Sequence, residues 1–142
     1  SGLYPYPDAV AAAVANADLL IGAVLIPGAR APHVVSRAMV ASMQPGSVIV
    51  DIAVDQGGCV ETTRATDYSA PTFVEEEVIH FGVTNMPAAV PRSASQALSA
   101  EIFPYVKLLL EEGLLPDGAL ATAINVQQGR IVHPAVAESL SH

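Results

Sequence analysis

At 142 residues the chain is long enough for one domain, and half of its residues are hydrophobic, which is enough to bury a core. Six basic residues against 14 acidic ones give a net charge of -8, which argues against binding to nucleic acid or to an anionic membrane surface. Only 14% of the residues are charged, below the usual quarter or so, and we therefore expect large contacts with further sequence or with other subunits.

The cysteine content and the start of the chain bear on its cellular location. The single cysteine, Cys59, excludes an intrachain disulfide and fits a reducing compartment, so we expect a cytoplasmic protein. No apolar run approaches the length of a membrane span. The first seven residues lack the basic and apolar regions of a signal peptide. Because the sequence begins without Met, we expect it to be cut from something longer or to start with a tag remnant.

The first part of the chain alternates between predicted helices and strands. A helix is predicted over residues 7–16, where Pro7 suits the first helical turn. Residues 19–25 form an apolar run that a Pro-Gly dipeptide ends, a second helix is predicted over residues 32–43, and residues 48–53 form a second apolar run. Short apolar runs between turn signals are typical of strands buried on both faces. This order predicts the βαβ unit of a parallel sheet.

The middle of the chain adds a third strand and a long helix. Residues 61–69 are predicted to be a polar loop, and a short strand over residues 72–74 follows. Residues 78–83 are the third apolar strand, and Ser93 is expected to cap a helix over residues 94–112. We expect the three apolar strands to be parallel neighbours in one sheet.

The long helix and the tail complete the prediction. Pro104 should kink the helix, because proline removes a backbone hydrogen bond, and Gly113 should end it. Apolar residues lie on nearly every side of this helix, so we expect it to be buried between two bodies of protein. The tail is expected to contain a short helix near Ala119, a turn at residues 128–129 and a last helix over residues 134–140.

Polar or glycine-containing turns follow each of the three apolar strands. Residues 25–32 (LIPGARAP) follow the first, Asp55 and a Gly-Gly pair follow the second, and Asn85 follows the third. Parallel sheets bind ligands at the carboxyl ends of their strands, so these turns predict a nucleotide-binding crevice. Taken alone, Asp55 is better explained as a turn residue that bonds its own backbone, and Asn85 can be explained as the end of a strand.

Several motifs are absent. The chain has neither GxGxxG nor GxxxxGK[ST], so neither kind of phosphate-binding loop is present in it. The four histidines have no zinc-binding spacing and Cys59 has no CxxC partner, so we expect no metal site. No GxSxG sequence occurs. His80, within an apolar strand, is expected to be a packed core residue, and Cys59 a buried thiol.

Four motifs together resemble one family. In chain order they are residues 17–29 (ADLLIGAVLIPGA), 46–58 (GSVIVDIAVDQGG), 82–95 (GVTNMPAAVPRSAS) and 129–138 (GRIVHPAVAE). They resemble the C-terminal part of the NAD-binding domain and the C-terminal segment of the alanine dehydrogenase/nicotinamide nucleotide transhydrogenase family. The similarity covers nearly the whole chain. Asp55 and the Asn-Met-Pro sequence at residues 85–87 favour alanine dehydrogenase over the related transhydrogenase.

The resemblance implies an α/β fold, part of a Rossmann-like doubly wound parallel sheet. Residues 1–90 would be the second half of the NAD-binding domain, and residues 91–142 a C-terminal helical segment that packs on a catalytic domain outside this chain. That N-terminal half would supply the glycine-rich loop, a substrate-binding Arg and Lys, and a catalytic His. The family is expected to form a cytoplasmic homo-oligomer, a hexamer. The implied reaction is the reversible, NAD-dependent oxidative deamination of L-alanine to pyruvate and ammonia, for which this piece alone would be inactive.

The resemblance also implies roles for single residues. Asp55 would be the catalytic carboxylate, which handles protons and holds positive charge that develops on the imine. Asn85 would bond the nicotinamide or the substrate. The further NAD contacts that it implies, besides Asp55 and Asn85, are Val24, Leu25, Ile52, Ala53, Val54, Arg64, Val83, Thr84 and Met86.

Two alternatives stay open at this point. The chain could be the NAD(H)-binding component of a nicotinamide nucleotide transhydrogenase, or a non-catalytic domain that mediates subunit assembly. The upstream coding sequence separates the three hypotheses, because a GxGxxG loop with Lys and His motifs supports the dehydrogenase.

Overall fold

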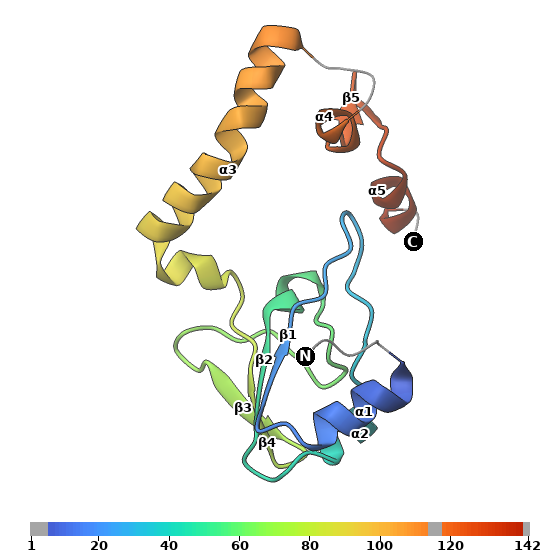
Figure 1. The fold of residues 1–142 in the computed structure, drawn as a ribbon, viewed down its shortest axis with the longest axis vertical. Helices are drawn as coiled ribbons and strands as arrows, with labels where there is room; N and C mark the ends of the chain where they lie inside the picture. The colour runs from blue at the N-terminus through green and yellow to red at the C-terminus, as the bar shows by residue number, and fades with distance from the viewer. Residues whose placement is uncertain (1–5, 114–117, 141–142) are drawn as a thin grey trace. The chain divides into compact units, whose positions relative to one another are not determined.

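A computed structural model describes residues 6–113 and 118–140 of the chain (Figure 1). The chain divides into two compact units. Unit 1 runs to Ile26 and resumes over Arg30–Met86, and unit 2 comprises Pro27–Ala29 and the chain from Pro87 onward. The start of the sequence, on which the signal-peptide expectation depends, lies mostly outside the described residues.

Unit 1 is built on a four-stranded sheet with the order β1-β2-β4-β3 (Figure 1). Its strands are β1 (Leu19–Gly22), β2 (Val48–Asp51), β3 (Thr72–Glu75) and β4 (Val78–Phe81). β1 is parallel to β2 and β2 is parallel to β4, whereas β3 is antiparallel to β4. Both the α/β fold class and the parallel pairing of the three apolar strands are therefore confirmed.

All three apolar strands end earlier than predicted. The run over residues 48–53 leaves the sheet after Asp51 and turns into the 3-10 helix η1 (Ile52–Gln56). The cause is local, because the Asp51 carboxylate accepts a hydrogen bond from the Ala53 N–H at 3.0 Å and so caps the new helix. At the end of the third run, Val83 forms an isolated bridge with Thr66 instead of continuing β4.

The helix predicted over residues 32–43 is wrong in its extent. Only α2 (Arg37–Ala41) forms, and the Ser36 hydroxyl caps it by accepting a backbone N–H at 3.3 Å. The N–H groups of Val34 and Val35 both donate to the Cys59 carbonyl, at 2.8 and 3.2 Å. These two hydrogen bonds to a distant segment hold Val34 and Val35, which precede α2, in an extended conformation. Valine, whose side chain is β-branched, favours this conformation.

The two helices of unit 1 lie side by side and cover one face of the sheet (Figure 1). α1 (Pro7–Ala15) has nearly its predicted extent. The core between helices and sheet contains Val14, Ala31, Val35, Val40, Met43, Ile49, Ala53, Cys59, Val60 and Val78. On the other face Leu19 and Ile21 are 56% and 59% exposed, so the expectation of strands buried on both faces is wrong for β1. The reason is that the described helices of unit 1 pack against only one side.

A buried carboxylate ties the end of β2 to the loop after η1. Asp51 is 1% exposed, and its oxygens accept the N–H groups of Ala53, Cys59 and Val60 at 3.0, 2.8 and 3.1 Å. The Thr63 hydroxyl donates to the same carboxylate at 2.7 Å. Hydrogen bonds from several donors make a buried carboxylate stable, and they also fix the path of every segment that donates.

An ion pair joins α2 to the turn between β3 and β4. Glu76 and Glu77 have φ angles of 52° and 61°, a left-handed conformation that side chains other than glycine rarely adopt. The Arg37 guanidinium contacts the carboxylates of Glu75 and Glu76 at 2.5 and 2.7 Å. The hydrogen bond from Arg37 lowers the pKa of Glu75. Because these groups are exposed, the pair contributes little stability and mainly positions the turn.

Unit 2 is mostly helical. Its elements are α3 (Pro91–Glu112), α4 (Ala119–Thr122), the hairpin of β5 (Val126–Gln127) and β6 (Arg130–Ile131), and α5 (Pro134–Ser139). The short helix, the turn at residues 128–129 and the stop at Gly113 match the predictions. The predicted start of the long helix is wrong, because α3 begins at Pro91 after Val90 and Ser93 does not cap it. α3 continues through Pro104, where the kink stays a prediction.

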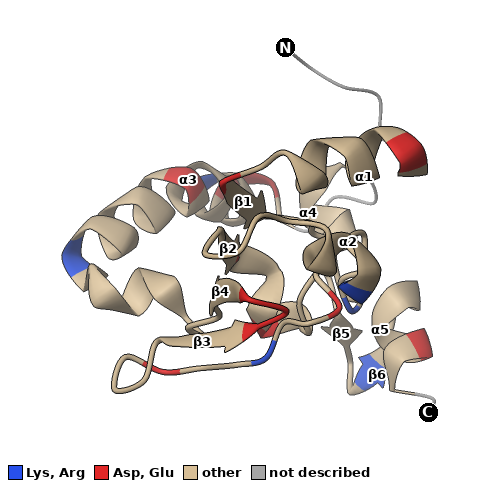
Figure 2. Cartoon of the chain, turned by 90° about the horizontal axis from the view of Figure 1, so that it is seen from below, with Lys and Arg blue, Asp and Glu red and all other residues tan. Residues whose placement is uncertain are grey.

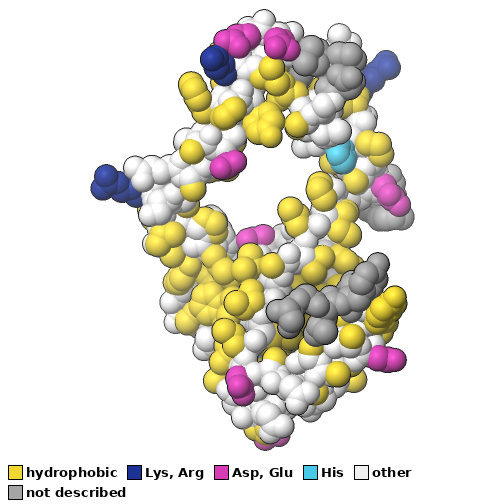
Figure 3. All heavy atoms as spheres, viewed as in Figure 1, with side chains coloured by type: hydrophobic (Ala, Val, Ile, Leu, Met, Phe, Trp, Pro, Cys, Tyr) yellow, Lys and Arg dark blue, Asp and Glu magenta, His cyan; other side chains and the backbone are white. Residues whose placement is uncertain are grey.

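The surface of α3 is strongly apolar. None of its residues is buried in the described chain. Its large exposed side chains are Leu98, Ile102, Phe103, Tyr105, Val106, Leu109 and Leu110. Hydrophobic side chains lie all along this helix in Figure 3, and the few charged residues of the chain are scattered (Figure 2). None of the described helices combines the length and the apolar character that crossing a membrane requires.

Two adjacent glycines provide a matched test of the packing around Asp51. Gly57 and Gly58 both have positive φ, 97° and 83°, but a Cβ on Gly58 would lie 2.8 Å from the Thr63 side chain, whereas a Cβ on Gly57 would meet nothing within 4 Å. Gly57→Ala is expected to cost about 1 kcal/mol of backbone strain. Gly58→Ala adds steric overlap, so we expect it to cost about 1–3 kcal/mol more. Urea unfolding of the two variants measures the difference, and equal losses would contradict the packing.

A second prediction concerns the Asp51 carboxylate itself. Asp51→Asn places an NH2 group against backbone N–H donors, and we expect it to lower the free energy of unfolding by about 3 kcal/mol. Thr63→Val, the control, removes one donor and leaves the carboxylate with its backbone partners, so about 1 kcal/mol is expected. Equilibrium unfolding checks both values. An Asn variant as stable as the parent would show that the carboxylate charge is not needed.

Candidate functional site

The turns after β2 and β4 meet at the carboxyl end of the sheet. Both carboxylate oxygens of Asp55, at the end of η1, accept the backbone N–H of Asn85 at 3.1 Å. Asp55 and Asn85 are both exposed, so their polar groups also face solvent. The structure therefore brings together the two residues that the sequence placed after different strands.

Asn85 itself has an unusual backbone. Its φ is 50°, in the left-handed region that asparagine tolerates better than most residues. Its N–H donates to the Asp55 carboxylate. At the next residue of the same turn, the Tyr68 hydroxyl donates to the Met86 carbonyl at 3.3 Å.

The other predicted residues beside this turn differ in exposure. Ala53 and Val54 are buried within η1, and Ile52 is half exposed. Val83 is buried and pairs with Thr66, whereas Thr84 is exposed and its N–H donates to the Thr66 carbonyl at 3.2 Å. Backbone groups and an exposed apolar side chain thus surround the Asp55–Asn85 pair.

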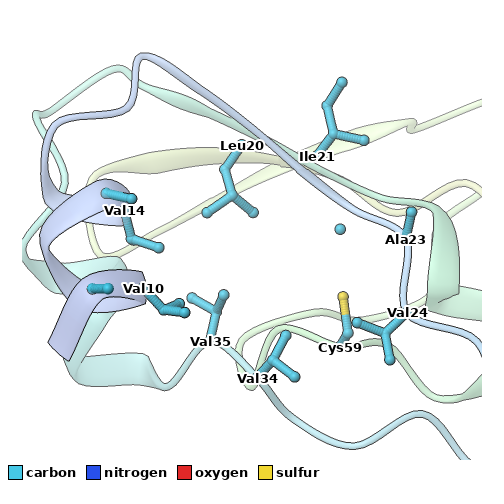
Figure 4. Close-up of a pocket in the computed structure, with 12 residues that line it drawn as sticks. Val10, Val14, Leu20, Ile21, Ala23, Val24, Val34, Val35 and Cys59 are labelled. Carbon is cyan, nitrogen blue, oxygen red and sulfur yellow. The ribbon is translucent and has the colours of Figure 1, made fainter. Parts of the chain in front are cut away.

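Val24 and Leu25 follow β1, away from the Asp55–Asn85 pair. Val24 lines an open pocket of about 280 Å³ between α1, the end of β1 and the Cys59 segment (Figure 4). The pocket has no charged lining residue, and it includes neither Asp55 nor Asn85. Leu25 is 68% exposed and lies outside the lining. The pocket is therefore an apolar surface next to β1, and the polar chemistry lies elsewhere.

Arg64 takes part in a stack of side chains. Its guanidinium lies 4.0 Å from the ring centre of Phe73, in the range of a cation–π contact. The Phe73 ring in turn stacks on His80, with centroids 4.9 Å apart. The structure thus places the Arg64 side chain against β3 and does not bring it to the Asp55–Asn85 pair.

His80 and Cys59 are buried, as predicted. The Nδ1 atom of His80 lies 3.0 Å from the Val78 carbonyl, to which it donates, and Nε2 forms a hydrogen bond of 2.7 Å with the Thr62 hydroxyl. Burial raises the pKa of the Cys59 thiol, which keeps it protonated and unreactive. No three His, Cys, Asp or Glu side chains of residues 6–113 and 118–140 form a group that could hold a metal ion.

Two contributors to this region were not singled out from the sequence. A charged residue inside an apolar strand is unusual, so Asp51 could have been found from its position within the run over residues 48–53. Tyr68 lies in a polar loop, where no sequence pattern distinguishes it.

The geometry suits acid–base chemistry at the exposed Asp55. An ionised carboxylate oxygen has more than one lone pair, so each can still accept a proton or a hydrogen bond while it holds the Asn85 N–H. Such a carboxylate can take a proton from water or stabilise a cation.

The similarity to known proteins is extensive. Residues 3–134 match the family model described as "Alanine dehydrogenase/PNT, C-terminal domain". The chain is 46% identical over 136 residues to the alanine dehydrogenase of Halomonas elongata and 47% identical over 132 residues to that of Mycolicibacterium smegmatis. These alignments cover 93% and 90% of the chain.

Two solved structures are also similar. An L-alanine dehydrogenase matches 96% of the chain with a TM-score of 0.74 and 52% identity. The transhydrogenase from Sinorhizobium meliloti matches 92% of the chain with a TM-score of 0.68 and 32% identity. The first match confirms the Rossmann-like fold.

The alignments cover most of this chain but much less of its relatives. The chain spans 37% of the Halomonas enzyme and 36% of the Mycolicibacterium enzyme, and 38% of the L-alanine dehydrogenase of known structure. The family model nevertheless matches nearly the whole chain. The chain therefore belongs to the alanine dehydrogenase/PNT C-terminal domain family.

Proposed function

We propose that the chain is the C-terminal part of an NAD-dependent alanine dehydrogenase, which converts L-alanine reversibly to pyruvate and ammonia. The observation that carries the proposal is the exposed Asp55 carboxylate, held through both oxygens by Asn85 at the carboxyl ends of two parallel strands. The names of the similar proteins support the same reaction.

The proposal includes an N-terminal half that completes the NAD-binding domain and supplies the catalytic domain. β1 lies at the end of the described sheet, and Leu19 and Ile21 are exposed on its uncovered face, so unit 1 offers an edge and a face for further sequence. In this arrangement residues 1–90 are the second half of the NAD-binding domain, and residues 91–142 pack on the catalytic domain through the apolar surface of α3. The whole protein would be a homo-oligomer.

Residues of this chain are suited to one side of a dinucleotide. We place the adenosine half beside Val24 and Leu25, and the nicotinamide half beside η1, the turn at Thr84–Met86 and Asp55. Leu25 and Ile52 provide exposed apolar surface, while Asp55 and Asn85 provide exposed polar groups. NAD held by these residues would supply the acceptor for the hydride that leaves Cα of alanine.

In this mechanism Asp55 acts on the substrate and on the water that attacks it. Loss of hydride leaves an iminium carbon that water attacks, and the Asp55 carboxylate accepts the proton of that water and offsets the positive charge. The Asn85 N–H fixes the direction of the carboxylate. The Asn85 side chain would bond the substrate or the nicotinamide.

The transhydrogenase hypothesis has support from the Sinorhizobium meliloti structure. The identity is lower than for the L-alanine dehydrogenase, 32% against 52%, which favours the dehydrogenase. A domain that only mediates assembly has no specific observation in its favour.

The proposal predicts that the full-length protein reduces NAD in the presence of L-alanine, whereas the 142-residue chain alone does not. The chain should also bind NAD weakly, because no glycine-rich phosphate loop is present in it. Absorbance assays of NADH measure the activity with L-alanine, and calorimetric titration with NAD measures the binding. Full-length protein that transfers hydride from NADH to NADP but ignores alanine would support the transhydrogenase, and tight NAD binding by the chain alone would contradict the division of the cofactor site.

A substitution at Asp55 tests the catalytic role. Asp55→Asn in the full-length protein retains an oxygen that can accept the Asn85 N–H, but it loses the charge and the ability to take a proton. We expect turnover to fall about 100-fold or more, with an unchanged melting temperature. The control is Asp18→Asn, at an exposed aspartate that precedes β1 at the other end of the sheet. Near-native turnover of a folded Asp55→Asn protein would falsify the role, because Asn serves equally well in a turn.

A further inference from the structure

We propose that Tyr68 is a positioning residue that holds the Asn85–Met86 turn and, through it, the Asp55 carboxylate. The kinetic consequence of this inference rests on the proposed function. Its structural consequence rests on the geometry of unit 1. Tyr68 comes from the loop between η1 and β3, which carries none of the residues that the resemblance assigned to the substrate.

The loop is built to present Tyr68. The Asp67 carboxylate accepts hydrogen bonds from the N–H groups of Ser69 and Ala70, at 2.8 and 3.2 Å, and from the Ser69 hydroxyl. These bonds form an Asx-turn in which Tyr68 is the second residue. The bond from the Ser69 hydroxyl lowers the pKa of Asp67, because the hydrogen bonds of this turn favour the ionised carboxylate.

The same loop is fixed against the strand end that leads to Asn85. The Thr66 N–H donates to the Gly82 carbonyl at 2.8 Å, and the Thr84 N–H donates to the Thr66 carbonyl at 3.2 Å. A Cβ on Gly82 would lie 2.3 Å from the Arg64 carbonyl, so only glycine allows this close approach. The loop backbone next to Tyr68 is therefore fixed relative to the strand end that leads to the Asn85–Met86 turn.

Two hydrogen bonds hold the turn at adjacent residues, Asn85 and Met86. Asn85 is left-handed, and its N–H points to the Asp55 carboxylate, while the carbonyl of the next residue, Met86, accepts the Tyr68 hydroxyl at 3.3 Å. A left-handed residue relaxes when its neighbours do not hold it. Removing the Tyr68 hydroxyl removes one of these two hydrogen bonds, and we infer that Asn85 then holds the Asp55 carboxylate less firmly.

The structural part is tested by hydrogen–deuterium exchange of the full-length protein, with mass spectrometry of a peptide that covers residues 82–90. Tyr68→Phe keeps the ring and removes only the hydroxyl. We expect exchange in this peptide to become about 3- to 10-fold faster, which corresponds to the loss of one neutral hydrogen bond. The control Ser42→Ala removes an exposed hydroxyl hydrogen bond at the end of α2 and should leave the exchange of this peptide unchanged. Exchange at the parent rate in Tyr68→Phe overturns the proposal.

The kinetic part uses a double-mutant cycle. Tyr68→Phe should lower kcat about 3- to 10-fold, because it loosens the turn that holds the catalytic carboxylate, and a change in the KM for alanine would report on the Asn85 side chain that the same turn carries. In an Asp55→Asn background the same change should have no further effect on kcat, since both variants act on one carboxylate. Additive losses would mean that Tyr68 acts independently of Asp55, and an unchanged kcat despite faster exchange would also overturn the positioning role.

The outcomes separate the two proposals. A parent protein that does not oxidise alanine removes the proposed function, and the exchange experiment still decides whether Tyr68 holds the turn. A parent that oxidises alanine, with a Tyr68→Phe variant equal to it in exchange and kcat, retains the function and removes this inference.

Discussion

The structure of unit 1 depends on a single buried carboxylate. Asp51 ends β2, caps η1 and accepts donors from the loop that follows, so three segments of chain are tied to one side chain. An ionised carboxylate in a core is stable only when its lone pairs are satisfied. The loop is therefore obliged to return to the end of β2, and this return determines where η1 ends and where Asp55 lies.

The order of the sheet could be predicted because it depends on patterns within single strands. Apolar runs with short connections predict parallel neighbours, and β1, β2 and β4 pair in that way. The helix predicted over residues 32–43 failed because hydrogen bonds to Cys59, 24 or more residues away, decided the backbone of Val34 and Val35. The expectation that β1 is buried on both faces failed for a related reason, because burial depends on what covers a strand and not on the strand itself.

The candidate site, like the fold, could be predicted where it depends on patterns within single strands and not where it depends on distant contacts. Asp55 and Asn85 could be paired from the sequence because both follow strands of one parallel sheet. The partner of Asp55, however, is the backbone N–H of Asn85, and no residue type encodes such a main-chain contact uniquely. Tyr68 was missed for the same reason, because a tyrosine hydroxyl that meets a main-chain carbonyl leaves no complementary residue in the sequence.

Two aspartates four residues apart thus have opposite physical settings. The carboxylate of Asp51 is enclosed by donors and has no access to solvent, so it cannot exchange a proton with a substrate. Asp55 is exposed, and in the described part of the chain its carboxylate is held by the Asn85 N–H, so its lone pairs are available while its direction is fixed. The first turn of η1 lies between them and separates a residue that builds the strand end from one that can act at it. The rigidity of the first is what allows the second to be exposed and still be well placed.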